Sequence, residues 1–321
     1  MKRKLISTLL IVLTIFIFSC KEDDKGIKVG ISKIVAHPAL DAIEKGIIDT
    51  IKKEYPNATF DLQNANGDMG TATQIANKFK TEKVDIAIGI ATPTAMALVG
   101  VLEDIPIVYS AVTDPVSAGI VKSTTIGEKN IAGVSDMTPV AAQIELLTKM
   151  TPIKTLGHIY NSGEANGVAL KDIAKEYCKN NNIKFVEAVV TNTSEVKQAA
   201  LSIMGKVDGI YLGNDNTIFA ALPAILEIAN EQKVPVMTAD PQSALDGDVF
   251  AAMGFDQYKL GVASGNVAVD VLKGKDTTKI PTVYLTKTND LNFVVNLDVA
   301  KAIGVTIPNN ILKQATTVLG E

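Results

Sequence analysis

Several short polar segments of the sequence carry side chains that could bind a small molecule. Each segment directly follows an apolar run and offers small, hydroxyl, amide or carboxylate groups. Hydroxyls and free backbone N–H groups suit a bound anion, whereas carboxylates suit a bound cation. The segments are 35–37 (VAH), 91–94 (ATPT), 111–115 (AVTDP), 161–166 (NSGEAN), 213–216 (GNDN) and 239–241 (ADP).

Two of these segments sit in closely similar surroundings. Residues 85–95 read DIAIGIATPTA and residues 208–220 read DGIYLGNDNTIFA, so each is an apolar run, a polar turn and a helix-like stretch. The first turn supplies the hydroxyls of Thr92 and Thr94, and the second supplies the carboxylate of Asp215. A cleft with hydroxyls on one wall and a carboxylate on the other fits a zwitterion such as an α-amino acid.

Helix capping is the alternative explanation for these turns. Thr92, Asn161, Asn214 and Asp240 are all residue types that commonly cap a helix N-terminus. For any one of them, capping alone is sufficient. Six such turns collected at one predicted sheet edge favour a binding site, and capping and ligand contact can coexist.

The elements that would position these turns follow an α/β pattern. Short apolar runs alternate with amphipathic stretches, and the pattern restarts near residue 155. Such an order predicts two similar lobes, each a doubly wound parallel sheet covered by helices on both faces. Strands are expected at 27–34, 58–62, 84–90, 106–110, 155–160, 183–189, 207–212, 234–238, 249–254 and 280–285, with helices at 38–55, 71–80, 93–102, 164–179, 194–204, 217–231 and 257–273.

The extra strand and helix after the second lobe suggest that the chain returns to the first lobe. We therefore expect an N-terminal lobe of residues 27–137 plus 250–278 and a C-terminal lobe of residues 138–249 plus 279–321, ending in a helix-poor tail. Several strands crossing between lobes would form a hinge. Ligands of parallel sheets bind beyond the carboxyl ends of the strands, so the polar turns should face one another across the cleft.

The N-terminus has the features of an export signal. Residues 2–4 are basic, residues 5–18 are apolar and uncharged, and Ser19 and Cys20 follow. The apolar run is too short for a comfortable membrane span and is typical of a secretory signal. A cysteine after a small residue resembles a bacterial lipobox, which implies a lipoprotein signal peptide over residues 1–20, lipidation of Cys20 and a tether over residues 21–26. An ordinary signal or an uncleaved anchor is the alternative.

Composition excludes several functions and constrains the site. The net charge is −4 without a basic block after the signal, so we expect no nucleic-acid partner. Arg3 is the only arginine, so a bound carboxylate must be held by backbone N–H groups, hydroxyls, amides or lysine. Cys178 lies in a helical pattern and is expected to be a buried thiol. His37 and His158 have no zinc-ligand spacing, so we predict neither a metal nor a cofactor.

Enzyme motifs are not evident. Ser162 and Ser243 lack the setting of a nucleophile elbow, and residues 67–70 (GDMG) are not a dinucleotide fingerprint. Glu164 and Asp215 could form a paired-carboxylate site as in a glycosidase, but no other feature supports this. The sequence therefore indicates a binding protein and not an enzyme.

The sequence resembles the ABC-transporter substrate-binding lipoproteins of the tryptophan/tyrosine type, which have the type I periplasmic-binding fold. The resemblance extends from residue 27 to about residue 285, and Gly167 departs from it because a serine is expected after Glu-Ala-Asn. The motifs that carry it are 37–41 (HPALD), 64–68 (NANGD), 91–95 (ATPTA), 111–115 (AVTDP), 163–166 (GEAN) and 214–217 (NDNT).

This resemblance implies capture of an amino acid, aromatic or apolar, outside the cytoplasmic membrane. The two lobes would close over it and deliver it to the permease and ATPase of an ABC importer, and we expect a monomer. We assign the α-carboxylate to Thr92, Thr94 and neighbouring N–H groups, and the α-ammonium to Asp215. The full set of expected ligand-binding residues is His37, Thr92, Thr94, Ala111, Thr113, Asp114, Glu164, Asn166, Asn214, Asp215 and Asp240.

Two alternatives remain at this point. The same fold could bind a sugar or a nucleoside, although the sequence has no tryptophan and no arginine after the signal to support a sugar site. A sensor lobe that reports to a membrane receptor is the second alternative. An aromatic surface for the ligand would have to come from Tyr or Phe, and the candidates are Tyr109, Tyr160, Phe219 and Phe255, although core packing is the better explanation for most of them.

Overall fold

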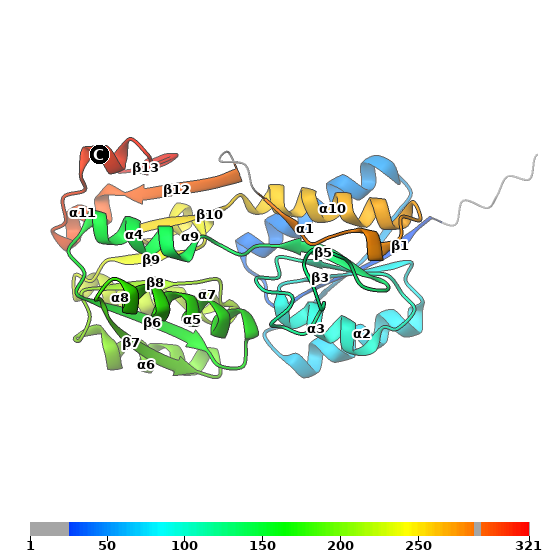
Figure 1. The fold of residues 1–321 in the computed structure, drawn as a ribbon, viewed down its shortest axis with the longest axis horizontal. Helices are drawn as coiled ribbons and strands as arrows, with labels where there is room; N and C mark the ends of the chain where they lie inside the picture. Colours follow the sequence, from blue (N-terminus) through cyan, green and yellow to red (C-terminus); the bar gives the residue numbers. More distant parts are fainter. Residues whose placement is uncertain (1–25, 286–289, 321) are drawn as a thin grey trace, which may run out of the picture.

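The structure is a computed structural model that describes residues 26–285 and 290–320, and it consists of two α/β lobes side by side (Figure 1). Each lobe is built on one sheet with helices on both faces, which confirms the predicted fold class. The predicted signal peptide, Cys20 and nearly all of the tether lie outside the described residues. None of the helices in the described ranges is long and apolar enough to cross a bilayer.

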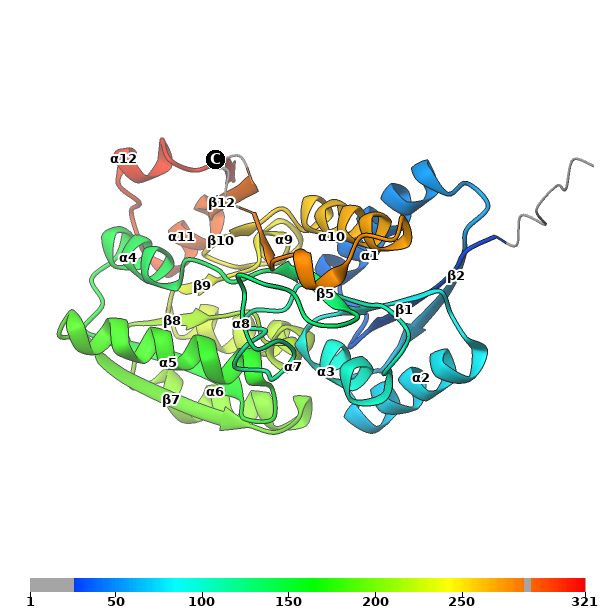
Figure 2. The ribbon, with the colours of Figure 1, turned by 45° about the vertical axis from the view of Figure 1, so that its right-hand side comes forward.

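The first lobe has a parallel six-stranded sheet in the order β11-β5-β4-β3-β1-β2. Helices α1 and α10 cover one face, and helices α2 and α3 cover the other (Figure 2). The strands are β1 (Lys28–Lys33), β2 (Thr59–Asn64), β3 (Ile86–Ile90), β4 (Ile107–Ser110), β5 (Ile131–Ser135) and β11 (Val283–Tyr284); the helices are α1 (Pro38–Glu54), α2 (Met69–Glu82), α3 (Thr92–Val101) and α10 (Gln257–Leu272), with a 3-10 turn at Thr277–Lys279.

The second lobe has a seven-stranded sheet in the order β13-β12-β10-β9-β8-β6-β7, in which only the β10–β12 pair is antiparallel. Its strands are β6 (Thr155–Asn161), β7 (Lys184–Val190), β8 (Gly209–Leu212), β9 (Val236–Thr238), β10 (Ala251–Phe255), β12 (Leu291–Asn296) and β13 (Thr317–Leu319). Its helices are α4 (Val140–Met150), α5 (Ala165–Asn180), α6 (Val196–Met204), α7 (Asn216–Ala220), α8 (Leu222–Glu231), α9 (Pro241–Asp246), α11 (Leu297–Ile303) and α12 (Asn309–Leu312), with a 3-10 turn at Thr193–Glu195.

The strand pairing corrects two of the predicted lobe boundaries. Residues 251–255, assigned by sequence to the N-terminal lobe, form β10, which pairs with β9 and β12 of the second sheet. Residues 283–284, assigned to the C-terminal lobe, form β11, which pairs with β5 of the first sheet. The sequence pattern identified a strand followed by a helix, but the chain crosses between lobes after β10 and not before it. The lobe to which each of these strands belongs depends on the strand with which it pairs, and some of these partners are far away in sequence.

Other elements escaped the sequence pattern or were divided. Strands β5, β12 and β13 and helix α4 were not predicted, and the C-terminal tail contains helices α11 and α12. The helix expected over residues 217–231 is interrupted at Ala221, where α7 ends and α8 begins. Pro223 lies in the first turn of α8 and cannot donate a backbone hydrogen bond, which favours a new helix start there.

Helix α10 is held on the first lobe by close backbone contact with α1. A Cβ atom at Gly261 would lie 2.2 Å from the carbonyl oxygen of Ile43, and one at Gly46 would lie 2.4 Å from the carbonyl oxygen of Tyr258. Only glycine permits this approach without a shift of the helices. Buried Ile43, Ile47 and Leu260 belong to the same core. The contact fixes α10 immediately after the chain enters the first lobe from β10.

We predict that Gly261→Ala lowers the free energy of unfolding by about 1–3 kcal/mol, because the added methyl group must push α10 away from α1. Urea unfolding of the chain measures this change. Gly100→Ala is the matched control, because a Cβ atom at this exposed position of α3 meets no other atom within 4 Å. The control should be neutral or stabilise the protein by up to about 1 kcal/mol. Equal effects of the two substitutions would contradict the close-contact interpretation.

Candidate ligand-binding site

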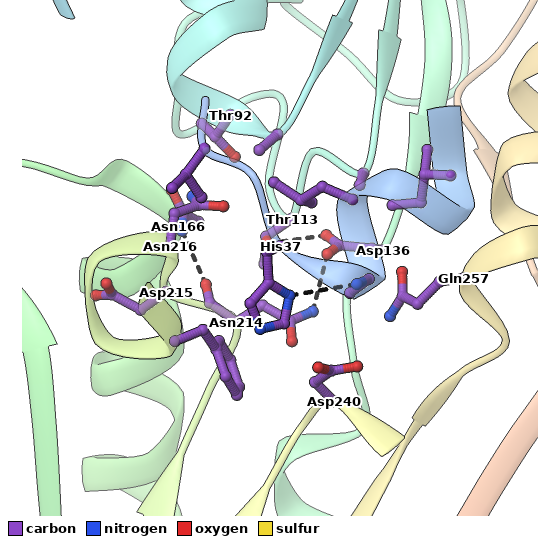
Figure 3. A pocket seen from close by; sticks show the side chains of 17 residues that line it. His37, Thr92, Thr113, Asp136, Asn166, Asn214, Asp215, Asn216, Asp240 and Gln257 are labelled. Carbon is purple, nitrogen blue, oxygen red and sulfur yellow. Dashed lines mark hydrogen bonds between the residues drawn. The ribbon is translucent and has the colours of Figure 1, made fainter. Parts of the chain in front are cut away.

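A cavity lies between the lobes at the carboxyl ends of the strands (Figure 3). The first lobe contributes the segments that follow β1, β3 and β4 and the start of α10, and the second contributes those that follow β8 and β9 and the start of α5. This is the position expected for ligands of parallel sheets. The lining residues are Val35, His37, Ala39, Leu40, Ile43, Ala91, Thr92, Ala111, Thr113, Asp136, Asn166, Asn214, Asp215, Asn216, Phe219, Asp240 and Gln257.

The first-lobe wall presents hydrogen-bond donors. Thr92 is the first residue of α3, and its buried hydroxyl has no hydrogen-bond partner among the described residues. The backbone N–H groups of a first helical turn have no intrahelical partners. Ala91 and Ala111, which follow β3 and β4, have left-handed backbone conformations with φ of 76° and 54°. Such a conformation costs free energy for a residue other than glycine and is typical of functional sites.

Two of the expected first-lobe residues do not line the cavity. The hydroxyl of Thr94 donates to the carbonyl oxygen of Ile90 at 2.6 Å. The carboxylate of Asp114 accepts from the backbone N–H groups of Val116 and Ser117. Both side chains therefore stabilise the turns in which they lie.

The second-lobe wall contains the carboxylate of Asp215, which is only 3% exposed. Its oxygens accept hydrogen bonds from the backbone N–H groups of Asn161 at 2.6 Å and Ile218 at 3.1 Å. Burial, reinforced by the nearby charge of Glu164, raises the pKa of Asp215 well above its usual range. A positive charge beside this carboxylate would stabilise its ionised form.

Glu164 organises the start of α7 and does not line the cavity. Its carboxylate accepts hydrogen bonds from the backbone N–H groups of Asn216 and Thr217 and from the side chains of Asn166, Asn216 and Thr217. These donors occupy both of its oxygens. Glu164 was expected among the ligand-binding residues; in the structure it holds Asn166 and Asn216, which do line the cavity.

Asn166 has an amide whose orientation is fixed by its neighbours. Its Nδ2 donates to Glu164 Oε2 at 3.1 Å and to the carbonyl oxygen of Asn214 at 2.8 Å. Because both partners are acceptors, the NH₂ group must face them and Oδ1 must face elsewhere. Oδ1 is buried and has no hydrogen-bond partner among the described residues. Thr92 and Asn166 thus present a donor and an acceptor from opposite lobes.

Asp136 is a site residue that the sequence analysis missed. It lies in the segment that leads from β5 to α4, where the chain first crosses between the lobes. Its carboxylate accepts from Thr113 Oγ1 at 2.9 Å in the first lobe and from Asn214 Nδ2 at 2.8 Å in the second (Figure 3). Burial raises the pKa of Asp136. The short strand before it went unrecognised, so the sequence offered no strand end at which to look for it.

In Figure 3, Asp240 and Gln257 both lie on the opposite side of the cavity from Thr92. Asp240 caps α9 by accepting from the backbone N–H groups of Gln242 and Ser243, as its residue type suggested. Burial raises its pKa to about 6. Gln257, the first residue of α10, was also missed, because it follows a crossing whose position was wrongly predicted.

The remaining lining is mainly apolar and includes one ring pair that joins the lobes. The rings of His37 and Phe219 are 5.9 Å apart. His37 Nδ1 accepts from the backbone N–H of Ala39 and so caps α1, which places the proton of the neutral ring on Nε2. Burial lowers the pKa of His37. Of the four aromatic side chains considered from sequence, Phe219 lines the cavity, whereas Tyr109, Tyr160 and Phe255 do not.

Gly167, where the sequence departs from the tryptophan/tyrosine-type pattern, lies against Asp215. A Cβ atom at Gly167 would lie 2.5 Å from Asp215 Oδ2 and 3.2 Å from the carbonyl oxygen of Asn161. A serine at this position would therefore require Asp215 to move.

The chain belongs to the family described as ABC transporter substrate binding protein, whose model matches residues 28–319. It is 39% identical to a tyrosine-binding protein of Clostridioides difficile over 289 residues, which are 88% of this chain and 83% of the relative. A conserved domain protein of Vibrio cholerae matches with a TM-score of 0.88 at 39% identity, over 92% of this chain and 100% of the other.

Two further solved structures are similar to this chain. A Streptococcus pneumoniae ABC domain in complex with L-Trp matches with a TM-score of 0.87 at 32% identity, whereas a ligand-free, open substrate-binding protein of Clostridium difficile matches with 0.68 at 36% identity. Both cover 92% of this chain and are themselves covered completely. Both matches extend over the two lobes and support the same fold for this chain.

Family membership establishes the class of function. ABC transporter substrate-binding proteins act outside the cytoplasmic membrane, where they bind small molecules for import. The chain is therefore an extracytoplasmic substrate-binding protein, and the expectation of a binding protein in place of an enzyme is confirmed. Cys178 is a buried free thiol, as predicted, and burial raises its pKa to about 11.

We predict that Thr113→Val lowers the free energy of unfolding by about 1–3 kcal/mol near neutral pH, because Asp136 loses a donor while remaining buried. Without this hydrogen bond the pKa of Asp136 in the folded state rises further above its unfolded value. The extra loss of stability should therefore be present at neutral pH and disappear below about pH 3, where the carboxyl is largely protonated in both the folded and the unfolded state. Urea unfolding at both pH values measures it.

Thr50→Val is the control for this measurement. Thr50 is also buried, but its hydroxyl donates to the uncharged carbonyl oxygen of Gly46. Its substitution should change stability equally at the two pH values. A pH-independent loss in Thr113→Val would show that Asp136 is not the group affected.

Proposed function

We propose that this protein captures the zwitterion of an aromatic amino acid and delivers it to the permease and ATPase of an ABC importer. The observation that supports this most directly is the pair of buried, unpartnered polar atoms Thr92 Oγ1 and Asn166 Oδ1, which face the cavity from opposite lobes. A ligand that binds here can satisfy both, and buried polar groups in folded proteins are generally hydrogen-bonded. Relatives named for tyrosine binding and for an L-Trp complex support an aromatic side chain.

In this proposal the α-carboxylate accepts from Thr92 and from the free N–H groups at the start of α3. The α-ammonium donates to Asn166 Oδ1 and lies near Asp215, which compensates its charge. Asn214 holds Asn166 through its carbonyl oxygen and Asp136 through its side chain. The aromatic ring packs against Phe219 and the apolar side chains of α1.

Ligand binding would stabilise the closed arrangement of the lobes. The chain crosses between them after β5, after β10 and after β11, so rotation about these segments can open the cleft. A ligand that hydrogen-bonds to both walls favours the closed arrangement by its difference in affinity for the two states. We propose lobes of residues 26–135 with 257–285, and 140–255 with 290–320.

The ligand and its orientation can be tested by thermal unfolding of residues 26–320 with amino acids, sugars and nucleosides. A ligand at a hundred times its Kd stabilises the folded state by about 2.7 kcal/mol. We predict stabilisation by aromatic amino acids. Asp215→Asn, which keeps a capping oxygen but removes the charge, should weaken their binding by about 2–5 kcal/mol.

Asp68→Asn is the matched control, because Asp68 caps α2 in the same way but is exposed and does not line the cavity. An analogue without the α-amino group should be insensitive to Asp215→Asn. Stabilisation by sugars or nucleosides alone, or undiminished amino-acid binding in Asp215→Asn, would refute the assignment.

We also propose that the lipoprotein signal peptide is cleaved before Cys20, and that lipidated Cys20 becomes the new N-terminus and holds the protein as a monomer at a bacterial cell membrane, on the periplasmic side or at the cell surface. The apolar run before Ser19 and Cys20 and the charged tether after it support this. We predict that Cys20→Ser shifts the protein from the membrane fraction to the soluble fraction, as measured by fractionation and immunoblotting. Cys178→Ser, at the buried thiol, should leave the distribution unchanged; an unchanged distribution in Cys20→Ser would contradict lipid anchoring.

A further inference from the structure

The cavity has two polar ends, and the proposed amino-acid head group occupies only one of them. Thr92 and Asn166 lie at one end, whereas Asp240 and Gln257 lie at the other (Figure 3). An amino acid carries its carboxylate and ammonium on the same carbon, so both must bind at one end. The unpartnered donor of Thr92 and the unpartnered acceptor of Asn166 match this requirement. The far end must therefore face the side chain of the ligand.

The far end is built to accept a hydrogen bond. Asp240 is only 3% exposed, and its two oxygens each accept one backbone N–H bond of the α9 cap. A carboxylate offers about four lone-pair positions, so acceptor capacity remains toward the cavity. The amide of Gln257 makes no hydrogen bond to another residue in the described part of the chain. The cavity lining also includes the apolar side chains of Leu40, Ile43 and Phe219, which suit a ring.

A purely hydrocarbon side chain would be poorly accommodated at this end. It would remove water from Asp240 and Gln257 without replacing the lost hydrogen bonds, and such desolvation is costly. A ring that carries an N–H or O–H group would supply the missing donor. Sites that hydrogen-bond a polar ligand group discriminate strongly against the analogue that lacks it.

We propose that Asp240, assisted by Gln257, accepts a hydrogen bond from an N–H or O–H group on the aromatic ring of the ligand, so that the protein selects tyrosine or tryptophan over phenylalanine. This inference rests on the proposed function and adds the specificity residues of the same cavity. Tyrosine and tryptophan both carry a hydrogen-bond donor on the ring, the phenol O–H in tyrosine and the indole N–H in tryptophan.

The test measures the affinities of tyrosine, tryptophan, phenylalanine, O-methyltyrosine and 1-methyltryptophan by calorimetry. The wild-type protein should bind at least one of tyrosine and tryptophan about tenfold or more tightly than phenylalanine and than its own methylated analogue. Whichever of the two amino acids shows this preference identifies the donor as phenol or indole. Equal affinities for blocked and unblocked ligands would overturn the inference.

Two variants locate the acceptor. Asp240→Ser retains a residue that caps helices well but is too short to reach the ligand, and Gln257→Met keeps the length of the side chain without its polarity. Asp240→Ser should reduce the preference to about one, because the donor-bearing ligand binds more weakly. Phenylalanine should bind equally tightly or more tightly, because it no longer removes water from a carboxylate. Gln257→Met should reduce the preference in the same direction by a smaller factor. Asp68→Ser, at the exposed cap of α2, should leave all affinities unchanged.

The possible failures are distinguishable. If Asp240→Ser weakens tyrosine and phenylalanine by the same factor, Asp240 contacts the head group, and the inference fails while the proposed function stands. If Asp240→Ser does not fold, an unchanged preference in Gln257→Met overturns the two-residue assignment. If none of the aromatic amino acids binds to the wild-type protein, the proposed function itself fails.

Discussion

Parallel strands end on one edge of each sheet, and the polar groups that follow them collect in the space between the lobes, where they lose contact with water. Each such group must then find a partner, and most find one within the protein. Glu164 is saturated by the start of α7, Asp136 is held by one residue from each lobe, and Asp240 caps α9. The binding site consists of the hydrogen-bond donors and acceptors that remain unpaired after these internal bonds are made. These remaining groups determine which ligands the cavity can bind.

The protein binds a small molecule without a guanidinium group, because its only arginine is Arg3. Positive potential in the cavity comes from the start of α3 and from hydroxyl and backbone donors, whereas negative charge comes from three buried aspartates. Burial raises the pKa of each of these carboxyls, so each stands to gain from an ammonium or a neutral donor nearby. A ligand with both an anionic and a cationic group could therefore pair with the donors and with the buried carboxylates at the same time.

The sequence was sufficient to predict the α/β class, the two lobes and most turns of the site, because strand ends are visible as polar residues after apolar runs. It was not sufficient for Asp136 and Gln257, which lie next to crossings that only strand pairing reveals. It also could not separate Thr92, whose hydroxyl is free, from Thr94, whose hydroxyl donates to Ile90. That difference depends on which carbonyl group lies within reach, and residue type carries no information about it.

The fixed amide of Asn166 has a consequence for stereochemistry. Its neighbours hold it in one orientation, so the acceptor in the second lobe and the donor of Thr92 in the first lobe cannot exchange roles. If the side chain of the ligand must also extend toward Asp240, three attachment points have a defined order around the α-carbon. Such an arrangement is chiral, and a mirror-image amino acid could satisfy two of the three points at most.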